Sequence, residues 1–272
     1  METQMTRAAA LFSLVPLLGC GGGDSNGGDS DSDVDIDSDT DSDVDSDSDG
    51  DEICTEPVAI PCTDAIIIDL SLHDDLTSDG EVTTTTDGED FVTTIDATAG
   101  GFGKSSDYPW VYVRFGPEGA ERVDIDDETA LDSMEWHMAL RRFIVRLNGG
   151  DSGPSCVGAV SFLEETYSSL TSVADGLPYG LDDFYTDDCT LVNDSSGLPG
   201  SPQVVLAPWW EYAGCVATTG VPHLIRLEDG TVVKLVIESY YEDFADQTEC
   251  NETDEAPVDA VSGFFTVRWR IM

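Results

Sequence analysis

Basic residues are scarce in this sequence. Only 11 lysines and arginines stand against 56 aspartates and glutamates, which gives a formal net charge of -45. A surface of that sign repels phosphate groups instead of neutralising them, so nucleic acid is excluded as a partner. An anionic membrane surface is excluded as an electrostatic partner for the same reason. Any attachment to a membrane therefore requires an anchor of another kind.

Long apolar runs are also missing. The apolar run from Ala8 to Leu18 follows Arg7 and is shorter than the roughly 20 residues that a spanning helix needs. It ends in Leu-Leu-Gly-Cys at Cys20, which resembles the lipobox of bacterial lipoproteins. The resemblance implies that residues 1–19 are a signal peptide and that Cys20 carries lipid as the sole membrane anchor. An ordinary secretory signal with a chance cysteine is the alternative.

Apolar residues almost disappear from the segment after Cys20. Residues 20–52 contain the lipidated cysteine, then glycine, and then aspartate alternating mainly with serine. Such a segment cannot bury apolar area, and its like charges repel, so we predict a disordered acidic tether. A calcium loop of the pattern D-x-D-x-D-G-x5-E also fits, with the candidate ligands Asp45, Asp47, Asp49, Asp51 and Glu56. Alternating aspartates match this pattern cheaply and no flanking helices are evident, so loose cation condensation is favoured over a calcium site.

Cysteine spacing of the zinc type is absent, because no CxxC pair occurs among the seven cysteines. Once Cys20 is assigned to lipid, six cysteines remain in an exported chain, and we expect up to three disulfides among them. The six are Cys54, Cys62, Cys156, Cys189, Cys215 and Cys250. Fifteen complete pairings are possible for six cysteines. Cys54–Cys62 is the one pair that we predict, because it closes the shortest loop.

Helical periodicity is rare in the remaining chain, where β-branched and alternating runs predominate. Short helices are expected only at 128–134 or 162–172, and long loops at 148–156, 174–201 and 242–260. Extended segments are predicted at 65–72, 81–99, 110–115, 136–147, 202–206, 223–227, 231–239 and 263–271. Glu-Asp-Gly at 228–230 is typical of a hairpin turn. The sequence therefore predicts a single, mostly antiparallel all-β domain over 53–272.

One block carries a family resemblance. Trp136-His137-Met138-Ala139-Leu140, with Asn148, Gly150-Asp151-Ser152-Gly153 and Gly158-Ala159, resembles the core signature of the HmuY family. These are bacterial haem-binding lipoproteins of the outer membrane. The resemblance is strongest over 108–272. It implies one mostly β domain that captures haem or another flat small ligand. It also implies an outer-membrane receptor as a possible partner, and a location on the outer membrane, at the cell surface or facing the periplasm.

The residues that would hold haem iron are the ones this sequence lacks. The resemblance implies two histidine or methionine ligands, one within 165–195 and one near 213–215, and neither segment contains either residue. Tyrosine can replace them on ferric haem, and the candidates are Tyr167, Tyr179, Tyr185 and Tyr212. Packing is the alternative role for these rings. His137 is a further candidate, although a polar, partly exposed strand residue is the favoured interpretation.

Strand alternation places Trp136, Met138 and Leu140 on one face and His137 on the other, so we expect Met138 in the core. Gly150-Asp151-Ser152-Gly153 is similar to a serine-protease motif, but no histidine has a motif context that pairs it with Ser152. An enzyme is therefore not expected. Two functions stay open: haem or porphyrin binding without the usual iron ligands, and a non-haem ligand-binding or adhesion module on the same fold.

Overall fold

The structure is a computed structural model that describes residues 53–272 except 197 and 199. The predictions for the signal peptide, Cys20, the tether and the four aspartates of the calcium loop lie outside the described residues. The fifth calcium candidate, Glu56, is exposed. Within the described part of the chain, no helix has the length and apolar character needed to cross a membrane.

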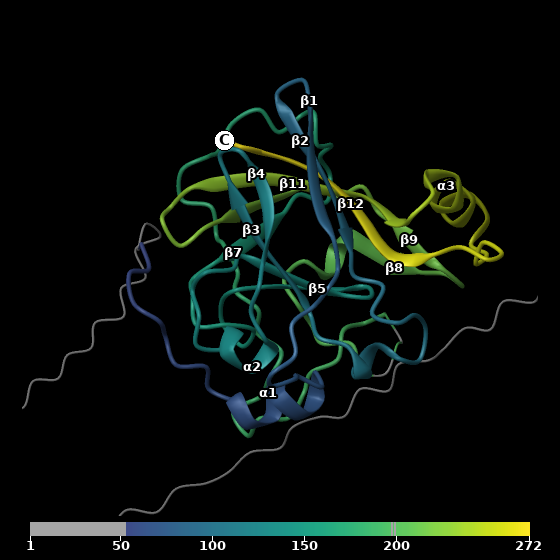
Figure 1. The fold of residues 1–272 in the computed structure, drawn as a ribbon. Helices are drawn as coiled ribbons and strands as arrows, with labels where there is room; N and C mark the ends of the chain where they lie inside the picture. The colour runs from purple at the N-terminus through teal and green to yellow at the C-terminus, as the bar shows by residue number, and fades with distance from the viewer. Residues whose placement is uncertain (1–52, 197, 199) are drawn as a thin grey trace, which may run out of the picture. The chain divides into compact units, whose positions relative to one another are not determined.

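Antiparallel strands in two larger sheets form the framework of the domain (Figure 1), which confirms the predicted fold class. The six-stranded sheet has the order β1 (Val82–Asp87), β2 (Asp90–Asp96), β12 (Ser262–Ile271), β11 (Val232–Tyr241), β10 (His223–Arg226) and β7 (Gly158–Ser161). The four-stranded sheet has the order β4 (Gly119–Val123), β3 (Val111–Gly116), β5 (Met138–Arg141) and β6 (Ile144–Leu147). A hairpin of β8 (Trp210–Tyr212) and β9 (Val216–Thr218) completes the strands.

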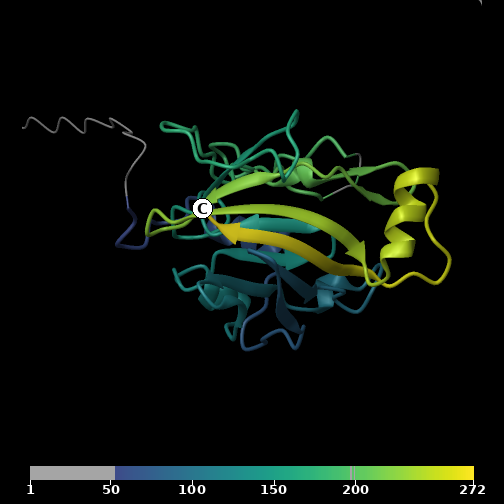
Figure 2. The same cartoon turned by 90° about the horizontal axis from the view of Figure 1, so that it is seen from above.

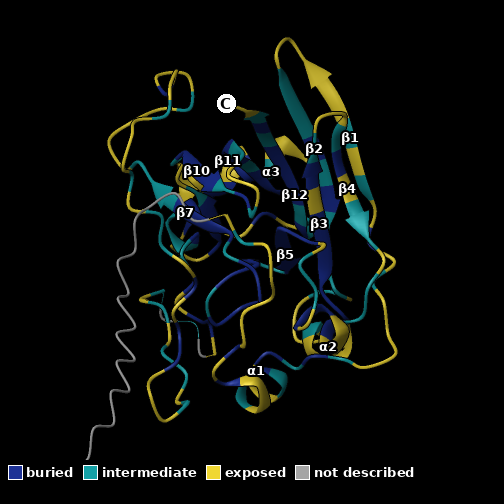
Figure 3. Cartoon of the chain, turned by 90° about the vertical axis from the view of Figure 1, so that its left-hand side faces the viewer, coloured by how far each residue is buried: buried dark blue, intermediate teal, exposed yellow. Residues whose placement is uncertain are grey.

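The main core lies where the two larger sheets face each other, and the long strands β11 and β12 cross it (Figures 2 and 3). Alternation decides which side chains enter it. In β12, Phe265, Val267 and Trp269 are fully buried, whereas Arg268 and Arg270 on the other face are partly exposed. The four-stranded sheet is buried on both faces, because Tyr112 and Ala139 contribute to a second core beneath the first helix.

That first helix, α1 (Thr63–Asp69), replaces a predicted strand at 65–72. Ile66 and Leu70, one helical turn apart, are buried in the second core, whereas Ile68 is 75% exposed. A spacing of four residues suits a helix that buries one face. The β-branched composition of the segment was a weaker influence than this packing, so the predicted strand is wrong.

A second correction concerns the predicted loop at 242–260, which contains the helix α3 (Phe244–Thr253). Asp243 caps its start by accepting a hydrogen bond from the Ala245 backbone N–H at 2.8 Å, and Asp254 ends it in the left-handed conformation with φ 59°. Both caps are short polar residues that also favour turns, which explains why the sequence suggested a loop.

The segment 136–147 is a hairpin of β5 and β6 and not one extended strand. Arg142 turns the chain with a positive φ of 54°. Trp136 precedes β5 and packs in the second core, whereas Met138 and Leu140 lie in the main core. The prediction that Met138 is a core residue is confirmed, but the prediction that Trp136 shares its face is wrong, because alternation holds only within the strand.

Smaller differences concern three other segments. The short helix α2 (Asp127–Ala130) overlaps the one predicted at 128–134, whereas 162–172 consists of turns and bends. The predicted strand at 202–206 is reduced to one bridge between Asn193 and Pro202. Two single-turn 3-10 helices, η1 (Ser105–Asp107) and η2 (Ala207–Trp209), lie in connections. The predicted hairpin turn at 228–230 joins β10 to β11.

Three disulfides connect the six predicted cysteines, which confirms the expected number. The pairs are Cys54–Cys156, Cys62–Cys189 and Cys215–Cys250, with sequence separations of 102, 127 and 35. The predicted pair Cys54–Cys62 is wrong. Cys54 is partly buried and its backbone N–H donates to Glu228 O at 3.0 Å, whereas Cys62 lies at the start of α1. Each of them therefore meets a distant loop and not the other.

Candidate functional site

The four candidate tyrosines lie in different parts of the domain. Tyr167 packs over Lys234, whose Nζ is 4.1 Å from the ring centroid. Tyr185 donates to Asp69 of α1 at 3.1 Å. The Tyr179 ring faces Arg226 at 4.9 Å. The structure therefore does not gather these rings around one ligand.

Tyr167 and Tyr212 lie near opposite ends of β11. Tyr167 contacts Lys234 close to the start of that strand. Tyr212 pairs with Val216, whose backbone N–H donates to the hydroxyl of Tyr241 at the end of the strand, at 3.4 Å. Seven strand residues separate the two ends by roughly 20 Å. Tyr167 and Tyr212 thus cannot reach one metal.

The phenol groups are also poor sources of phenolate. Tyr167 donates a 2.9 Å hydrogen bond to Asp90. Burial, this hydrogen bond and the carboxylate's charge raise the pKa of Tyr167. Burial and the neighbouring Asp69 raise the pKa of Tyr185 in the same way. Either tyrosine would have to lose its proton in order to bind ferric iron as phenolate, against burial and the neighbouring carboxylate.

His137 is only 2% exposed, so the expectation of a partly exposed strand residue is wrong. Its Nδ1 accepts a hydrogen bond from the Phe115 backbone N–H at 3.0 Å. Its Nε2 lies 3.0 Å from one carboxylate oxygen of Glu228. Because both ring nitrogens contact groups of the protein, His137 contributes to the packing of the fold and is not available to bind iron.

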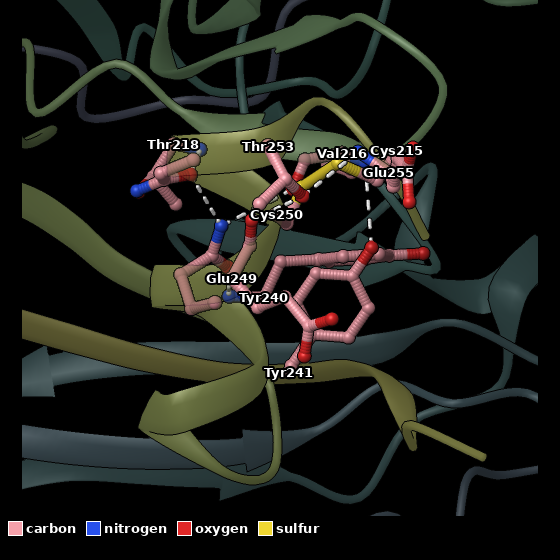
Figure 4. Close-up of a disulfide and its surroundings, with 11 residues drawn as sticks. Cys215, Val216, Thr218, Tyr240, Tyr241, Glu249, Cys250, Thr253 and Glu255 are labelled. Carbon is pink, nitrogen blue, oxygen red and sulfur yellow. Dashed lines mark hydrogen bonds between the residues drawn. A yellow bond between two sulfur atoms is a disulfide. The ribbon is translucent and has the colours of Figure 1, made fainter. Parts of the chain in front are cut away.

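The position near 213–215 is occupied by a covalent link. Cys215, in the turn between β8 and β9, is joined to Cys250 of α3, beside the rings of Tyr240 and Tyr241 (Figure 4). Asn251 of the same helix accepts a 3.0 Å hydrogen bond from the Thr218 backbone N–H. The hairpin and the helix are thereby fastened together at the place where the resemblance implies the second iron ligand.

The residues present therefore do not fit a haem-iron site with two protein ligands. Their donor atoms are separated, hydrogen-bonded or joined in a disulfide. In addition, the described residues contain no group of three or more histidine, cysteine, aspartate or glutamate side chains that could hold a metal ion.

The protease-like turn has a structural role. Ser152 is fully buried, and its hydroxyl donates to Asp182 Oδ2 at 2.6 Å. The same carboxylate accepts from the backbone N–H groups of Leu147 and Val205 at 3.0 and 2.8 Å. Burial raises the pKa of Asp182 to about 6, although these hydrogen bonds act in the opposite direction. The Ser152 hydroxyl thus takes part in the hydrogen bonds around Asp182, which connect β6 to the segments that contain Ser152 and Val205.

A pocket of about 570 Å³ gathers the best candidate binding groups at the start of β11 and the end of β12. We call it the basic pocket. Its lining includes Glu89, Asp90, Tyr167, Leu170, Lys234, Arg270, Ile271 and Met272. Met272 is the residue marked C in Figure 1, which locates the pocket at the end of the central strand β12. Of the predicted site residues, it contains only Tyr167.

Lys234 is the central cation of the basic pocket. It is 3% exposed, and its ammonium donates to the carbonyl oxygens of Tyr167 and Leu170 at 3.0 and 2.8 Å. Burial and the charge of Arg270 lower the pKa of Lys234, whereas Asp90 acts in the opposite direction. A buried ammonium with two carbonyl partners retains capacity for a third, anionic one.

Arg270 forms the rim of the same pocket. Its Nε lies 2.5 Å from Asp90 Oδ1 and its Nη1 lies 2.8 Å from Glu89 Oε2. Partial burial would raise the pKa of Asp90, but the hydrogen bonds from Arg270 and Tyr167 and the nearby arginine charges outweigh it and lower that pKa. Sequence reasoning missed both bases. The available signal was their rarity in so acidic a chain.

Comparison with known proteins gives structural matches alone. No protein-family model matches the chain, and no curated protein matches it. The chain is similar to a protein from Bacteroides vulgatus assigned as an HmuY-like heme-binding protein, with a TM-score of 0.41 and 19% identity over 72% of this chain and 97% of the other. It is also similar to a protein from Bacteroides fragilis assigned as a lipoprotein, with a TM-score of 0.38 and 16% identity over 68% and 91%.

A third similar structure is the apo HmuY analog of Tannerella forsythia. The TM-score is 0.36 and the identity is 17%, with 73% of this chain and 99% of the other covered. Two of the three structures bear the family name that the sequence resemblance gave.

Proposed function

We propose that this chain is a lipid-anchored protein of the bacterial cell envelope whose HmuY-like domain binds a small amphipathic ligand with carboxylate groups. A flat porphyrin such as haem is the first candidate. The observation that carries the proposal is the buried ammonium of Lys234 in the basic pocket of a chain whose net charge is -45. Its two carbonyl partners leave one N–H of the ammonium for a ligand anion, and pairing with an anion would offset part of the cost of burying the cation.

The pocket offers two kinds of contact. Lys234 and Arg270 can face ligand carboxylates, which would form short charge-assisted hydrogen bonds. The Tyr167 ring, Leu170 and Ile271 provide apolar surface for a flat ring system. Recognition through carboxylates and ring faces requires no ligand from the protein to the iron, which agrees with the separated tyrosines and the engaged His137.

Titration of the soluble domain with ferric haem and with metal-free protoporphyrin tests this proposal. We expect saturable binding of both, with dissociation constants within about threefold of each other, because the iron contributes little. Lys234→Met should weaken binding at least tenfold, which corresponds to about 1.4 kcal/mol. Lys104→Met is the matched control, since Lys104 is the other lysine of the chain and is exposed outside this pocket.

Free-ligand spectra throughout the titration would remove the porphyrin proposal. A dissociation constant for haem far below that for protoporphyrin would instead show that the iron is coordinated. Circular dichroism and melting temperatures of both lysine variants distinguish a lost contact from a lost fold.

The anchoring is proposed from the lipobox-like sequence that ends at Cys20. Labelled fatty acid supplied to cells should be incorporated into the wild-type protein and not into Cys20→Ser. Fractionation should place the lipidated form with the outer membrane, and protease treatment of intact cells distinguishes a surface-exposed domain from a periplasmic one.

A second candidate is a non-haem ligand-binding or adhesion module on the same fold. The observation that favours it is the Cys215–Cys250 disulfide, which occupies the position of an expected iron ligand. This candidate predicts no change of melting temperature with micromolar haem, because only a ligand that binds the native state raises it. A clear upward shift would contradict it.

A further inference from the structure

A second pocket of about 570 Å³ lies beneath the chain segment that leads into α1. We call residues 53–61 the N-terminal strap. Val58, Ala59 and Pro61 of the strap form one wall. The opposite wall belongs to the turns at 150–156 and 180–183, where Gly180 and Leu181 contribute. This apolar pocket is distinct from the basic pocket, because the two share no lining residue.

Three aspartates line this pocket; Asp183 is exposed, whereas Asp151 and Asp182 accept hydrogen bonds from the protein. Asp151 Oδ2 accepts from the backbone N–H groups of Phe184 and Tyr185 at 2.6 and 2.8 Å. Asp182 is 1% exposed and accepts three hydrogen bonds from its own surroundings. Through these hydrogen bonds, Asp151 and Asp182 hold the loops of the pocket wall in place. The surface that remains for a ligand is therefore mainly apolar.

One polar group in the wall lacks a partner. Ser155 is 3% exposed, and its hydroxyl is buried without a hydrogen bond. Its backbone N–H, in contrast, donates to the side chain of Asn148 at 3.2 Å. An unsatisfied buried hydroxyl lowers the stability of the fold. The hydroxyl oxygen is enclosed in this conformation, so a ligand reaches it only once the Ser155 side chain turns about χ1. A ligand atom that then accepts or donates a hydrogen bond would remove this cost, and the pocket walls would cover the rest of the ligand.

The pocket is held open in the absence of a ligand. The Cys54–Cys156 disulfide ties the strap to the opposite wall. Two backbone hydrogen bonds fasten the strap further, from Val58 N–H to Pro154 O at 2.7 Å and from Cys54 N–H to Glu228 O at 3.0 Å. Preformed walls reduce the entropy that a ligand must give up on binding.

From this geometry we propose that the apolar pocket is a binding site for a neutral, largely apolar small molecule with one polar atom directed at the Ser155 hydroxyl. Neutrality follows from the lining, which combines aliphatic side chains and glycines with aspartates and contains no lysine or arginine. A cation would lose its hydration against the aliphatic walls, and Asp151 and Asp182 already accept hydrogen bonds from the protein. An anion would meet a negative potential there. The volume lies within the range of about 300–1,000 Å³ that is usual for small-molecule sites.

The neutral dye Nile red, which carries one carbonyl oxygen, is a suitable probe for fluorescence titration of the folded domain. The wild type should enhance and blue-shift the emission with a stoichiometry of one. Val58→Trp should fill the pocket and weaken binding at least tenfold, since Val58 is 60% exposed and tolerates a larger side chain at its outer edge. Ser155→Ala should weaken binding about fivefold, the contribution of one hydrogen bond.

Val258→Trp is the matched control, because Val258 is 86% exposed and does not line the pocket. It should leave the affinity for Nile red unchanged. Leu181→Trp, from the opposite wall, repeats the filling test if Val58→Trp lowers the melting temperature. Equal affinity of the filled variants and the wild type would overturn the proposal, and so would the absence of any enhancement in the wild type. Lys234→Met should retain dye binding, so failure of the basic pocket does not affect this test.

Discussion

The basic pocket and the apolar pocket have the same volume and opposite chemistry. The basic pocket is built from side chains at the ends of strands, with a buried lysine at its centre. The apolar pocket is built from turns and the N-terminal strap, and a disulfide holds it. If both proposals hold, one β domain selects ligands by charge at the ends of two central strands and by apolar shape beneath a strap.

We expect the largest difference between the two pockets when the disulfide that holds the N-terminal strap is removed. Replacing Cys54 and Cys156 by serine removes a link across 102 residues, and we expect a loss of about 4–5 kcal/mol in the free energy of unfolding. Denaturant unfolding measures it. In the folded variant, Nile red binding should weaken at least tenfold while porphyrin binding stays within twofold. Equal weakening of both ligands would show that the two pockets are one coupled unit.

The next prediction concerns how the stability of the fold depends on pH through one titratable residue beside each pocket. Burial lowers the pKa of His223, which lies opposite Leu235 in the strand pair beside the basic pocket, to about 4. The unfolded histidine has an ordinary pKa near 6.5, so its neutral form stabilises the fold above that pH. This contribution is lost as the pH falls from about 6.5 to 4, and it amounts to about 3 kcal/mol.

Asp182, which lines the apolar pocket, acts with the opposite sign. Its pKa is raised to about 6, so its charged form costs stability at neutral pH. Stability is gained as the pH falls from about 6 to 4, again by about 3 kcal/mol. Relative to the wild type, His223→Gln should therefore lose less stability between pH 7 and 4, and Asp182→Asn should lose more. Unfolding curves at several pH values test both, and profiles parallel to the wild type would contradict the assignment.

The smallest expected effect concerns the rim of the basic pocket. Arg270 is partly exposed, and its ion pairs with Glu89 and Asp90 are accessible to solvent screening. Arg270→Gln should lower the free energy of unfolding by less than about 1 kcal/mol. It should also weaken porphyrin binding by a smaller factor than Lys234→Met does. A larger factor for the arginine would move the centre of recognition from the buried ammonium to the rim.

Much of the sheet structure was predictable because strand alternation is a local property. The segments 81–99, 223–227, 231–239 and 263–271 form strands where the sequence predicted them, and Glu-Asp-Gly forms the hairpin turn between β10 and β11. The strands missed at 119–123 and 158–161 are short. Their pairing with β3 and β10 depends on contacts that no local pattern encodes.

The candidate site was less predictable. Tyr167 was singled out as an iron ligand, yet in the structure its hydroxyl is bonded to Asp90 and its ring packs on Lys234. His137 was expected at the surface, but the two sheets enclose it between Phe115 and Glu228. In each case the residue type was informative, and its role depended on neighbours from distant strands.

The sequence by itself determined the fold class, the excess of acid, the even set of six cysteines and the lack of histidine and methionine where iron ligands were expected. These are properties of composition and local period. The tertiary structure alone decided that Cys54 pairs with Cys156, that residues 63–69 form a helix, and that Lys234 and Arg270 meet in one pocket. Those outcomes depend on which segments the packed core brings together. The free energy gained by burying apolar surface in that core outweighs the local preference of a segment for helix or strand.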